Sequence, residues 1–341
     1  MAVRVKLSDV ARRARVSAMS VSNYMNGRHG TMTEETRDRI AEAVTVLNYR
    51  PDMAARSVRT SKIQSVGLIV VDESPTYLSD GYTTQLVSGL GDALNAKGYT
   101  LQLEGLTASR LSASTLIRQR QTDGLCVLPT GSLATRKEII RTVAGTGQPF
   151  VLLLESLPRA WPDACCVLQT DRQGARELAR HVLERGARDL VVLKQSHNHW
   201  QAVAERQVGI EEAVAQFGEA ASLKVTQCGS GDVAATAAAL DAYLANARLP
   251  DAFMATNDQI GIAVLKYLKA RGIAVPGDVL VTGFNAFDFW QFSDPVLTTV
   301  RSPGFELGHR AGEAMIERME KGVFAERRIT LETTFQPSET T

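Results

Sequence analysis

The chain has few cysteines, and the four that it has are not spaced as metal ligands are. They are Cys126, Cys165, Cys166 and Cys228. The vicinal pair, Cys165 and Cys166, is a poor candidate for a structural disulfide. We therefore expect four buried free thiols, which suits a reducing cytoplasm.

Long apolar runs are also missing. No run reaches the ~20 residues that are needed to cross a bilayer. Arg4, Lys6 and Asp9 interrupt the N-terminus, which therefore lacks the apolar centre of a signal peptide. We expect a cytoplasmic protein with no membrane partner. Its 341 residues, 44% of them hydrophobic, are enough for two sizeable cores.

Motifs of common catalytic sites are absent as well. The sequence contains no GxSxG, no P-loop, no HExxH and no GxGxxG. His197 and His199 flank Asn198, but no nearby cysteine or carboxylate pattern completes a metal site, so a loop with two polar histidines is the favoured interpretation. We expect a protein that is not an enzyme and that holds no cofactor and no metal.

The formal net charge of +1 conceals a basic region and an acidic region. Residues 1–62 contain twelve Lys or Arg and six Asp or Glu, whereas the remainder contains 26 and 31. A basic N-terminal head on an acidic body points to a polyanion partner for the head. The alternative is a solvated basic surface without a partner, which the helical pattern of the head disfavours.

Apolar residues recur at helical spacing within the first 48 residues. They are Leu7, Val10, Ala11 and Ala14 in a first helix and Ile40, Ala43, Val44 and Leu47 in a third. Ser17 and Thr33 stand where hydroxyl caps would begin the second helix, 18–25, and the third. Asn26 and Gly27 tolerate the positive φ that ends a helix. Three short helices around one small core predict a helix-turn-helix domain, which lays its second helix in the major groove.

From Ser65 onward, strands alternate with helices. Seven segments are predicted to be buried strands: 65–71, 99–105, 124–129, 149–155, 189–194, 251–256 and 279–284. The predicted helices include 173–185, 204–217, 234–247 and 259–271. This alternation predicts a parallel sheet that is covered on both faces. Seven such strands exceed one modest sheet, so we expect two subdomains.

Several strings resemble the LacI/GalR family of bacterial repressors. In the head they are LSDVARRARVS, VSNYMNG, TEETRDRI and LNYRPDMAARS, and in the body VGLIV, GIAVPGDVLVTGFN and DPVLTTVRSPGFELG. The strings occur in order and span nearly the whole chain. The resemblance implies an all-α helix-turn-helix head on an α/β body of two periplasmic-binding-protein-like lobes, joined by three crossovers near residues 170, 301 and 328.

The expected domains follow from these crossovers. They are a helix-turn-helix domain over 1–48, a hinge helix and linker over 49–64, an N-terminal lobe over 65–170 plus 302–328, and a C-terminal lobe over 171–301 plus 329–341.

The resemblance places base-edge contacts at Ala18, Met19 and Asn23. Asn23 can pair with an adenine edge, and Ala18 or Met19 can pack on a thymine methyl. The family often has Arg at the position of Asn23, which suits guanine, so we do not expect the usual base preference. Contacts to phosphate or sugar are expected from Ser17, Ser20, Asn26 and His29. The alternative is that these four residues only cap helices, and Ser17 can do both.

Residues 51–60 are expected to form a hinge helix. By resemblance, such a helix folds on operator DNA, pairs with its dimer mate and opens the minor groove. Val58 follows Ala55 and Arg56 and stands where the family commonly has Leu as a wedge between bases. Unstacking a base step costs roughly a few kcal/mol, which contacts to the bent DNA offset. Val is shorter and stiffer than Leu, so we expect a shallower wedge; the alternative is an ordinary linker residue.

The resemblance also places an effector between the lobes, with Arg206 as the strongest candidate ligand. A guanidinium in a cleft can donate two hydrogen bonds to a sugar diol or a carboxylate. The alternative is a salt bridge on a helix surface. Asn257 and Asn285 are expected at strand ends, where ligands of open α/β sheets bind. The family usually has Asp at position 285, and a neutral Asn is compatible with a hydroxyl-rich or a more anionic ligand.

Three weaker candidates complete the expected effector site. Asp171 and Glu155 stand at strand ends, and Trp200 either stacks on a sugar face or nucleobase or belongs to the core. Five aromatic residues cluster near the last strand, and we expect one or two of them to touch ligand: Phe284, Phe287, Phe289, Trp290 and Phe292. The segment 72–90 is longer than usual in the family, so the roof of the pocket is expected to differ from its relatives.

These features predict a ligand-responsive regulator, with repression as the leading hypothesis. One head reads only a half-site, so we expect a homodimer on a pseudo-palindromic double-stranded operator. By resemblance, the expected effector is a sugar or a sugar derivative such as a sugar phosphate, with nucleosides as the less common alternative. The sequence shows no heptad-patterned tail, so no tetramerising helix is expected. The alternatives are an activator or dual regulator, a small-molecule-binding protein or enzyme with a vestigial head, and an architectural DNA-bending protein.

Overall fold

The computed structural model describes residues 5–30, 32–50, 62–156, 161, 163–196, 200–218 and 220–341. The chain divides into two units, Met1–Ile63 and Gln64–Thr341. No helix within the described residues is both long and apolar enough to cross a membrane.

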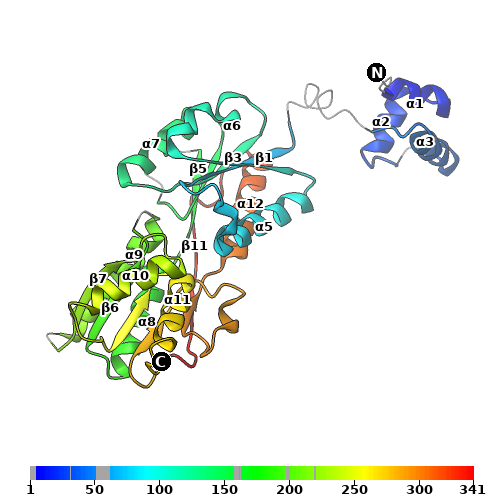
Figure 1. Cartoon of the computed structure of the whole chain (residues 1–341). Helices are drawn as coiled ribbons and strands as arrows, with labels where there is room; N and C mark the ends of the chain where they lie inside the picture. Colours follow the sequence, from blue (N-terminus) through cyan, green and yellow to red (C-terminus); the bar gives the residue numbers. More distant parts are fainter. Residues whose placement is uncertain are drawn as a thin grey trace. The chain divides into compact units, whose positions relative to one another are not determined.

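The first unit consists of the helices α1 (Leu7–Ala14), α2 (Ala18–Met25) and α3 (Glu34–Val46), shown in blue in Figure 1. Their shared core contains Val10, Ala11, Ala14, Val21, Ile40, Ala43 and Tyr49. Both predicted caps are confirmed: Ser17 Oγ accepts from the Ser20 N–H at 3.0 Å, and Thr33 Oγ1 accepts from the Thr36 N–H at 3.3 Å. The predicted helix-turn-helix domain is therefore present.

The second unit begins with an N-terminal lobe built on a six-stranded parallel sheet in the order β11-β5-β4-β3-β1-β2. The strands are β1 (Ser65–Val71), β2 (Thr100–Leu106), β3 (Gly124–Leu128), β4 (Phe150–Leu153), β5 (Ala164–Gln169) and β11 (Arg328–Leu331). Helices α5 (Gly81–Ala96) and α12 (Gly304–Lys321) cover one face, and α6 (Thr115–Arg118) and α7 (Leu133–Ala144) cover the other. Two short 3-10 helices, η1 (Tyr77–Ser79) and η2 (Ala108–Ala113), follow β1 and β2.

The C-terminal lobe is built on a four-stranded parallel sheet in the order β7-β6-β8-β9. Its strands are β6 (Asp189–Lys194), β7 (Ser222–Gln227), β8 (Ala252–Ala255) and β9 (Leu280–Thr282). Helices α8 (Asp171–Glu184) and α9 (Gln201–Phe217) cover one face, and α10 (Val233–Leu244) and α11 (Asp258–Lys269) cover the other. The 3-10 helix η3 (Trp290–Phe292) precedes β10 (Thr299–Arg301), which pairs antiparallel with β12 (Thr334–Gln336).

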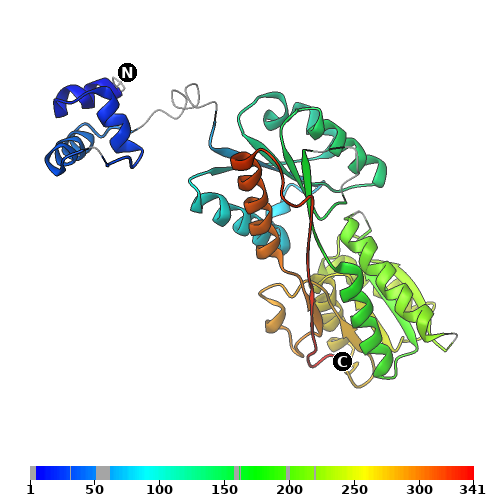
Figure 2. The same ribbon diagram turned by 180° about the vertical axis from the view of Figure 1, so that it is seen from behind.

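Three connections join the two lobes. The chain leaves the N-terminal sheet after Gln169, returns between Arg301 and Gly304, and leaves again after Leu331. Figures 1 and 2 show the last connection as a red segment that runs from one lobe to the other. The third crossover was expected near 328, with residue 329 onward in the C-terminal lobe. This boundary is wrong by a few residues, because 328–331 form β11, which pairs with β5 in the N-terminal sheet. The first and second connections lie at the expected positions.

All seven predicted strands are present as β1, β2, β3, β4, β6, β8 and β9, and the four predicted helices correspond to α8–α11. One strand differs from expectation, because β2 is a partly exposed edge strand instead of a buried one. The four cysteines are free and buried, as predicted. Cys165 and Cys166 are successive residues of β5 and therefore pack on opposite faces of the sheet.

Candidate functional site

The exposed side of α2 is the candidate nucleic-acid interface of the first unit. Ala18 and Met19 lie in its first turn, and 68% of Met19 is exposed. Asn23 is partly exposed one turn later. Val21 is fully buried on the opposite side and holds the helix on the core. An exposed large apolar side chain at the start of such a helix is available to a partner.

The four residues that were expected near phosphate also have local roles. Ser17 and Ser20 approach each other with their hydroxyl oxygens 2.9 Å apart, and the Asn26 side-chain amide donates to the Ser22 carbonyl oxygen at 2.6 Å. The exposed His29 ring packs edge-on against Tyr24 at 5.4 Å. These contacts leave Ser17, Asn26 and His29 exposed. The expected hinge residues Ala55, Arg56 and Val58 lie outside the described residues.

In the second unit, a cavity of about 960 Å³ lies between the two lobes. It is lined by segments that follow the carboxyl ends of β1, β3, β6, β7, β8 and β9. The strand order reverses direction between β1 and β3 in the first sheet and between β6 and β8 in the second. Ligands of open α/β sheets bind at such topological switch points. The topology therefore places the cavity where a ligand site is expected.

Arg206 of α9 lies at the base of this cavity, and only 5% of the residue is exposed. Its Nε donates to Asp171 Oδ1 at 2.7 Å, Nη1 to the Thr256 carbonyl oxygen at 2.7 Å and Nη2 to Asn285 Oδ1 at 2.8 Å. The guanidinium also lies 3.9 Å from the centre of the Phe284 ring. The alternative of a surface salt bridge is therefore wrong. Three of its five N–H donors are used by these bonds, and two remain.

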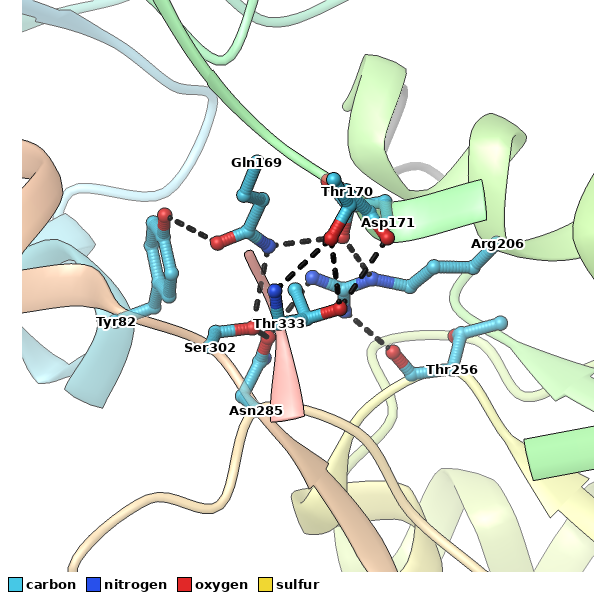
Figure 3. A network of polar contacts seen from close by, with 9 residues as sticks. All are labelled: Tyr82, Gln169, Thr170, Asp171, Arg206, Thr256, Asn285, Ser302 and Thr333. Carbon is cyan, nitrogen blue, oxygen red and sulfur yellow. Dashed lines mark hydrogen bonds and ion pairs between the residues drawn. The ribbon is translucent and has the colours of Figure 1, made fainter. Parts of the chain in front are cut away.

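The contacts of Arg206 continue into the connections between the lobes (Figure 3). Gln169 Nε2 donates to Asp171 Oδ1 at 2.8 Å and to Ser302 Oγ at 3.1 Å, and Ser302 Oγ donates to Asn285 Oδ1 at 3.0 Å. Tyr82 donates from its hydroxyl to Gln169 Oε1 at 3.0 Å. A buried network thus links the cavity to two of the three connections, from both lobes.

The third connection between the lobes is bonded to the first through a pair of threonines. Thr333 N–H donates to Thr170 Oγ1 at 2.9 Å, and the two hydroxyl oxygens lie 3.2 Å apart. Asn285 itself has a φ of 106°, a left-handed conformation that an L-residue with a side chain rarely adopts. Backbone bonds to Val300 and Ser302 fix it there. The backbone conformation thus holds the Asn285 oxygen where Arg206 and Ser302 both reach it.

Burial shifts the protonation of two carboxyl groups beside Arg206. It raises the pKa of Asp171, although the neighbouring Arg206 charge and the hydrogen bonds lower it. It also raises the pKa of Asp258 to about 7, against hydrogen bonds from Thr299 and the Phe287 N–H that lower it. Asp258 has no exposed surface and lies behind Phe287, which lines the cavity.

Asn257, Asn285, Trp200 and Arg206 all line the cavity, as expected. Asn257 also caps α11 by accepting from the Ile260 N–H at 2.9 Å. The Trp200 Nε1–H is buried and has no hydrogen-bond partner among the described residues.

The other two candidates do not line the cavity. Asp171 acts from behind, by fixing Arg206. Glu155 was expected in the effector site, and this placement is wrong. Its carboxylate pairs with Arg136 and accepts from the Ser156 N–H, and its neighbour Leu154 lines the cavity instead. Leu154 has a φ of 55°, so the chain turns at the end of β4.

The five aromatic residues separate into three kinds. Phe287 lines the cavity, Phe284 packs under Arg206, and Trp290 is buried. Phe289 and Phe292 are exposed by 45% and 86%. One member of the cluster, Phe287, therefore lines the cavity, and ligand contact by one or two of the five stays a prediction.

Sequence reasoning missed most of the polar lining. The missed residues include Asp72, Glu73, Tyr77, Asp80, Tyr82, Thr130, Ser132, Asp232 and Thr256. Most of them follow a strand or begin a helix, so the strand-end rule that selected Asn257 could have found them. His197 and His199 lie outside the described residues, and no group of three or more possible metal ligands occurs among the residues that are described.

Comparisons with known proteins agree with this architecture. The family model described as bacterial regulatory proteins, lacI family, matches residues 6–52, and a periplasmic binding protein-like domain matches residues 179–341. An HTH-type transcriptional regulator of Mycobacterium tuberculosis is 30% identical over 345 residues, which cover 94% of this chain and 92% of the relative.

Two solved structures share the fold. The lac repressor dimer bound to operator and the anti-inducer ONPF superposes with a TM-score of 0.83 at 18% identity and covers 99% of each chain. The complex of the transcriptional regulator CelR with cellobiose superposes with a TM-score of 0.70 at 23% identity. The match covers 99% of this chain and 100% of that chain. The chain belongs to the lacI family of bacterial regulatory proteins and is a transcriptional regulator with a helix-turn-helix DNA-binding domain and a periplasmic-binding-protein-like domain.

Proposed function

We propose that this chain is a cytoplasmic repressor that binds a pseudo-palindromic operator as a homodimer and is controlled by a small molecule in the cavity. The observation that carries the proposal is the buried network from Arg206 to the connections between the lobes. A ligand that contacts Arg206 or Asn285 touches the same atoms that tie the lobes together. Ligand binding is thereby coupled to the lobe arrangement.

The proposed DNA contacts follow the exposed side of the head. Ala18 and Met19 would pack on thymine methyl groups, and Asn23 would pair with an adenine edge. Ser17, Ser20, Asn26 and His29 would contact phosphate or sugar. Ala55, Arg56 and Val58 would contact the minor groove, with Val58 as the wedge.

The proposed effector site consists of Arg206, Asn257, Asn285 and Trp200, with Asp171 as the residue that positions Arg206. A sugar or sugar derivative suits this set, because amide and guanidinium N–H groups donate to hydroxyl oxygens while aromatic faces cover the apolar face of a sugar ring. Tyr77, Trp200 and Phe287 supply such faces. The similar CelR structure holds cellobiose.

Control requires that the ligand bind two lobe arrangements with different affinity. Arg206 and Asn285 belong to the C-terminal lobe, whereas Tyr82 and Gln169 of the same network belong to the N-terminal lobe. A change in the angle between the lobes therefore changes the distances that a ligand spans. This supplies the differential affinity.

Two observations support a homodimer. Phe289 and Phe292 expose large apolar surfaces on the C-terminal lobe, and burial of such surfaces against a second copy is favourable. The similar lac repressor is a dimer on its operator. A single head with one recognition helix contacts one half-site, so a symmetric operator needs two.

The test is selection of bound sequences from fragmented genomic DNA. The expected result is a pseudo-palindrome with two half-sites, one for each head of the dimer. Asn23→Ala should relax base preference at one position in each half-site by about 1–3 kcal/mol, while Glu42→Gln on α3 should leave it unchanged. Recovery of nothing enriched above random duplex would contradict the proposal.

A further inference from the structure

The cavity between the lobes carries an uneven distribution of charge. Among the described residues that line it, the charged side chains are Asp72, Glu73, Asp80, Asp232 and Arg206. Four of these five are carboxylates. Such a lining produces a negative potential at the place where an effector enters.

Arg206, the one cation among the described lining residues, does not reverse this sign. Arg206 is paired with Asp171 at 2.7 Å, and both side chains are about 6% exposed. The charge of Arg206 is therefore already balanced inside the protein, and what it offers a ligand is two N–H donors rather than a free positive charge.

Three of the carboxylates come from the same segment of the N-terminal lobe. Asp72 and Glu73 follow β1, and Asp80 precedes α5. Burial raises the pKa of Asp72. The negative charges of Asp80 and Glu73 raise this pKa further, so the three carboxylates are close enough to interact. Asp72 also accepts from the Ser74 N–H at 2.7 Å, which stabilises its charged form.

Helix N-termini at the cavity could attract an anion, but most are already capped by side chains. Asp80 caps α5 and Asp232 caps α10, by accepting from Thr83 and Ala235 at 3.1 and 2.8 Å. Ser132 and Asn257 cap α7 and α11 in the same way. Among the α-helices that begin here in the described part of the chain, only α9 has no side-chain cap, and the short 3-10 helices η1 and η2 have none either. A helix terminus carries roughly half a positive charge, which does not balance four carboxylates.

The same lining suits a neutral polyhydroxyl compound. Hydroxyl groups can donate to Asp72 and Glu73. They can accept from Arg206 and from the Trp200 Nε1–H, which has no partner among the described residues. An ammonium group would gain further from the carboxylates. A phosphate or carboxylate group offers the four acidic residues no proton to accept and is repelled by their charge.

We infer that the cavity selects a polyhydroxyl effector that carries no negative charge, and that Asp72, Glu73 and Asp80 exclude sugar phosphates and sugar acids. The inference rests on the proposed function, because it specifies the ligand of the same cavity. It makes the N-terminal lobe the source of charge selectivity.

The potential of the cavity can be measured without knowledge of the effector. Trp200 lines the cavity, so its fluorescence reports which small ions enter. The probes are caesium, iodide and the neutral quencher acrylamide at low ionic strength, and the difference between the wild type and Trp200→Phe isolates the Trp200 signal. We expect caesium to quench more strongly than iodide after each is scaled to acrylamide.

Matched variants assign the effect to the acidic segment. In the Asp72→Asn/Glu73→Gln variant, we expect the caesium-to-iodide ratio to fall roughly fivefold, because two charges that line the same cavity as the indole are removed. Glu138→Gln/Glu184→Gln removes two exposed carboxylates outside the cavity and should leave the ratio unchanged. Stronger quenching by iodide in the wild type would overturn the inference, as would equal changes in the two variants.

The same preference is measured on ligands with thermal unfolding, since binding to the folded state raises the midpoint. Glucose, cellobiose and ribose are each compared with their phosphate or acid derivatives, and glucose also with glucosamine. Midpoint rises that come from uncharged or amino compounds support the inference. A larger rise with an anionic derivative than with its parent overturns it, while the operator selection described above remains a separate test of the proposed function.

Discussion

The two walls of the cavity differ in how they are built. On the C-terminal lobe, Arg206 and Asn285 are buried and bonded to each other and to the connections between the lobes. On the N-terminal lobe, Glu73 is exposed and Asp72 and Asp80 are partly exposed, with hydrogen bonds to their own segment. The first wall has a fixed geometry before a ligand arrives, whereas the second supplies charge at the mouth.

This difference separates two kinds of cost. A buried polar group that loses its partner is penalised in the folded protein, because water cannot replace that partner. An exposed carboxylate is hydrated whether or not a ligand is present. Substitutions on the C-terminal wall should therefore lower stability and binding together, and those on the N-terminal wall should change binding with little cost in stability.

Arg206→Ala should have the largest effect. It leaves Asp171 buried without its cation, so the free energy of unfolding should fall by about 3–5 kcal/mol in denaturant titration. Arg172→Ala is the control, because its ion pair with Glu212 lies at the surface, where solvent screens it, and should contribute little to stability. Equal losses in the two variants would show that the C-terminal wall is not held by its buried network.

Asp258 should make the C-terminal wall sensitive to pH. Its folded pKa of about 7 exceeds the ordinary value of 3.8, so the folded protein holds a proton that the unfolded chain releases. The contribution of this proton to the free energy of unfolding is therefore fully present below about pH 4. It is lost as the pH rises to about 7, by roughly 4 kcal/mol across that range.

Asp258→Asn provides the comparison for this prediction, since it stays neutral throughout. As the pH rises between these values, the free energy of unfolding of the wild type should fall relative to that of the variant. Parallel pH profiles of the two proteins would contradict the assigned pKa. Chemical denaturation at several pH values measures both.

Asp80 allows charge and capping to be separated on the N-terminal wall. Asp80→Ala removes the cap of α5 and should cost about 1 kcal/mol, whereas Asp80→Ser keeps a capping oxygen and should cost a few tenths. Both remove the charge and should weaken exclusion of iodide equally. A smaller effect of the Ser variant on quenching would show that the cap, and not the charge, controls access.

Trp200→Phe should have the smallest effect on stability. The Nε1–H that it removes has no partner among the described residues, so unfolding free energy should change by less than about 1 kcal/mol. Ligand affinity should fall if this N–H donates to the effector. A large loss of stability with unchanged affinity would assign Trp200 to the core instead.

Sequence reasoning found the parts of the fold that depend on local pattern. The caps at Ser17 and Thr33 and the buried strands need only side-chain type and spacing. It did not find β5 or β7, because β5 begins with Ala-Cys-Cys and β7 is a mixed, partly exposed edge strand. It misplaced the third crossover because the local sequence of the short strand β11 does not show which of the two sheets the strand joins.

The candidate site was predictable in part for a similar reason. Arg206, Asn257 and Asn285 were identified by resemblance and by their places after strands, and the structure brings them together. Glu155 also follows a strand, but its pairing with Arg136 depends on the turn at Leu154 and on α7, which no local pattern shows. The segment 72–90, which holds Asp72, was expected to differ in length from the family, so the resemblance gave no roles for its residues.

The bonds between the lobe connections constrain how the body can move. Gln169 of the first connection holds Ser302 of the second, and Thr170 of the first meets Thr333 of the third. Three strands that are joined at one level share a single pivot and cannot swing independently. A change in the angle between the lobes therefore has to move all three connections together. A small molecule that fixes one connection restrains the other two through these bonds.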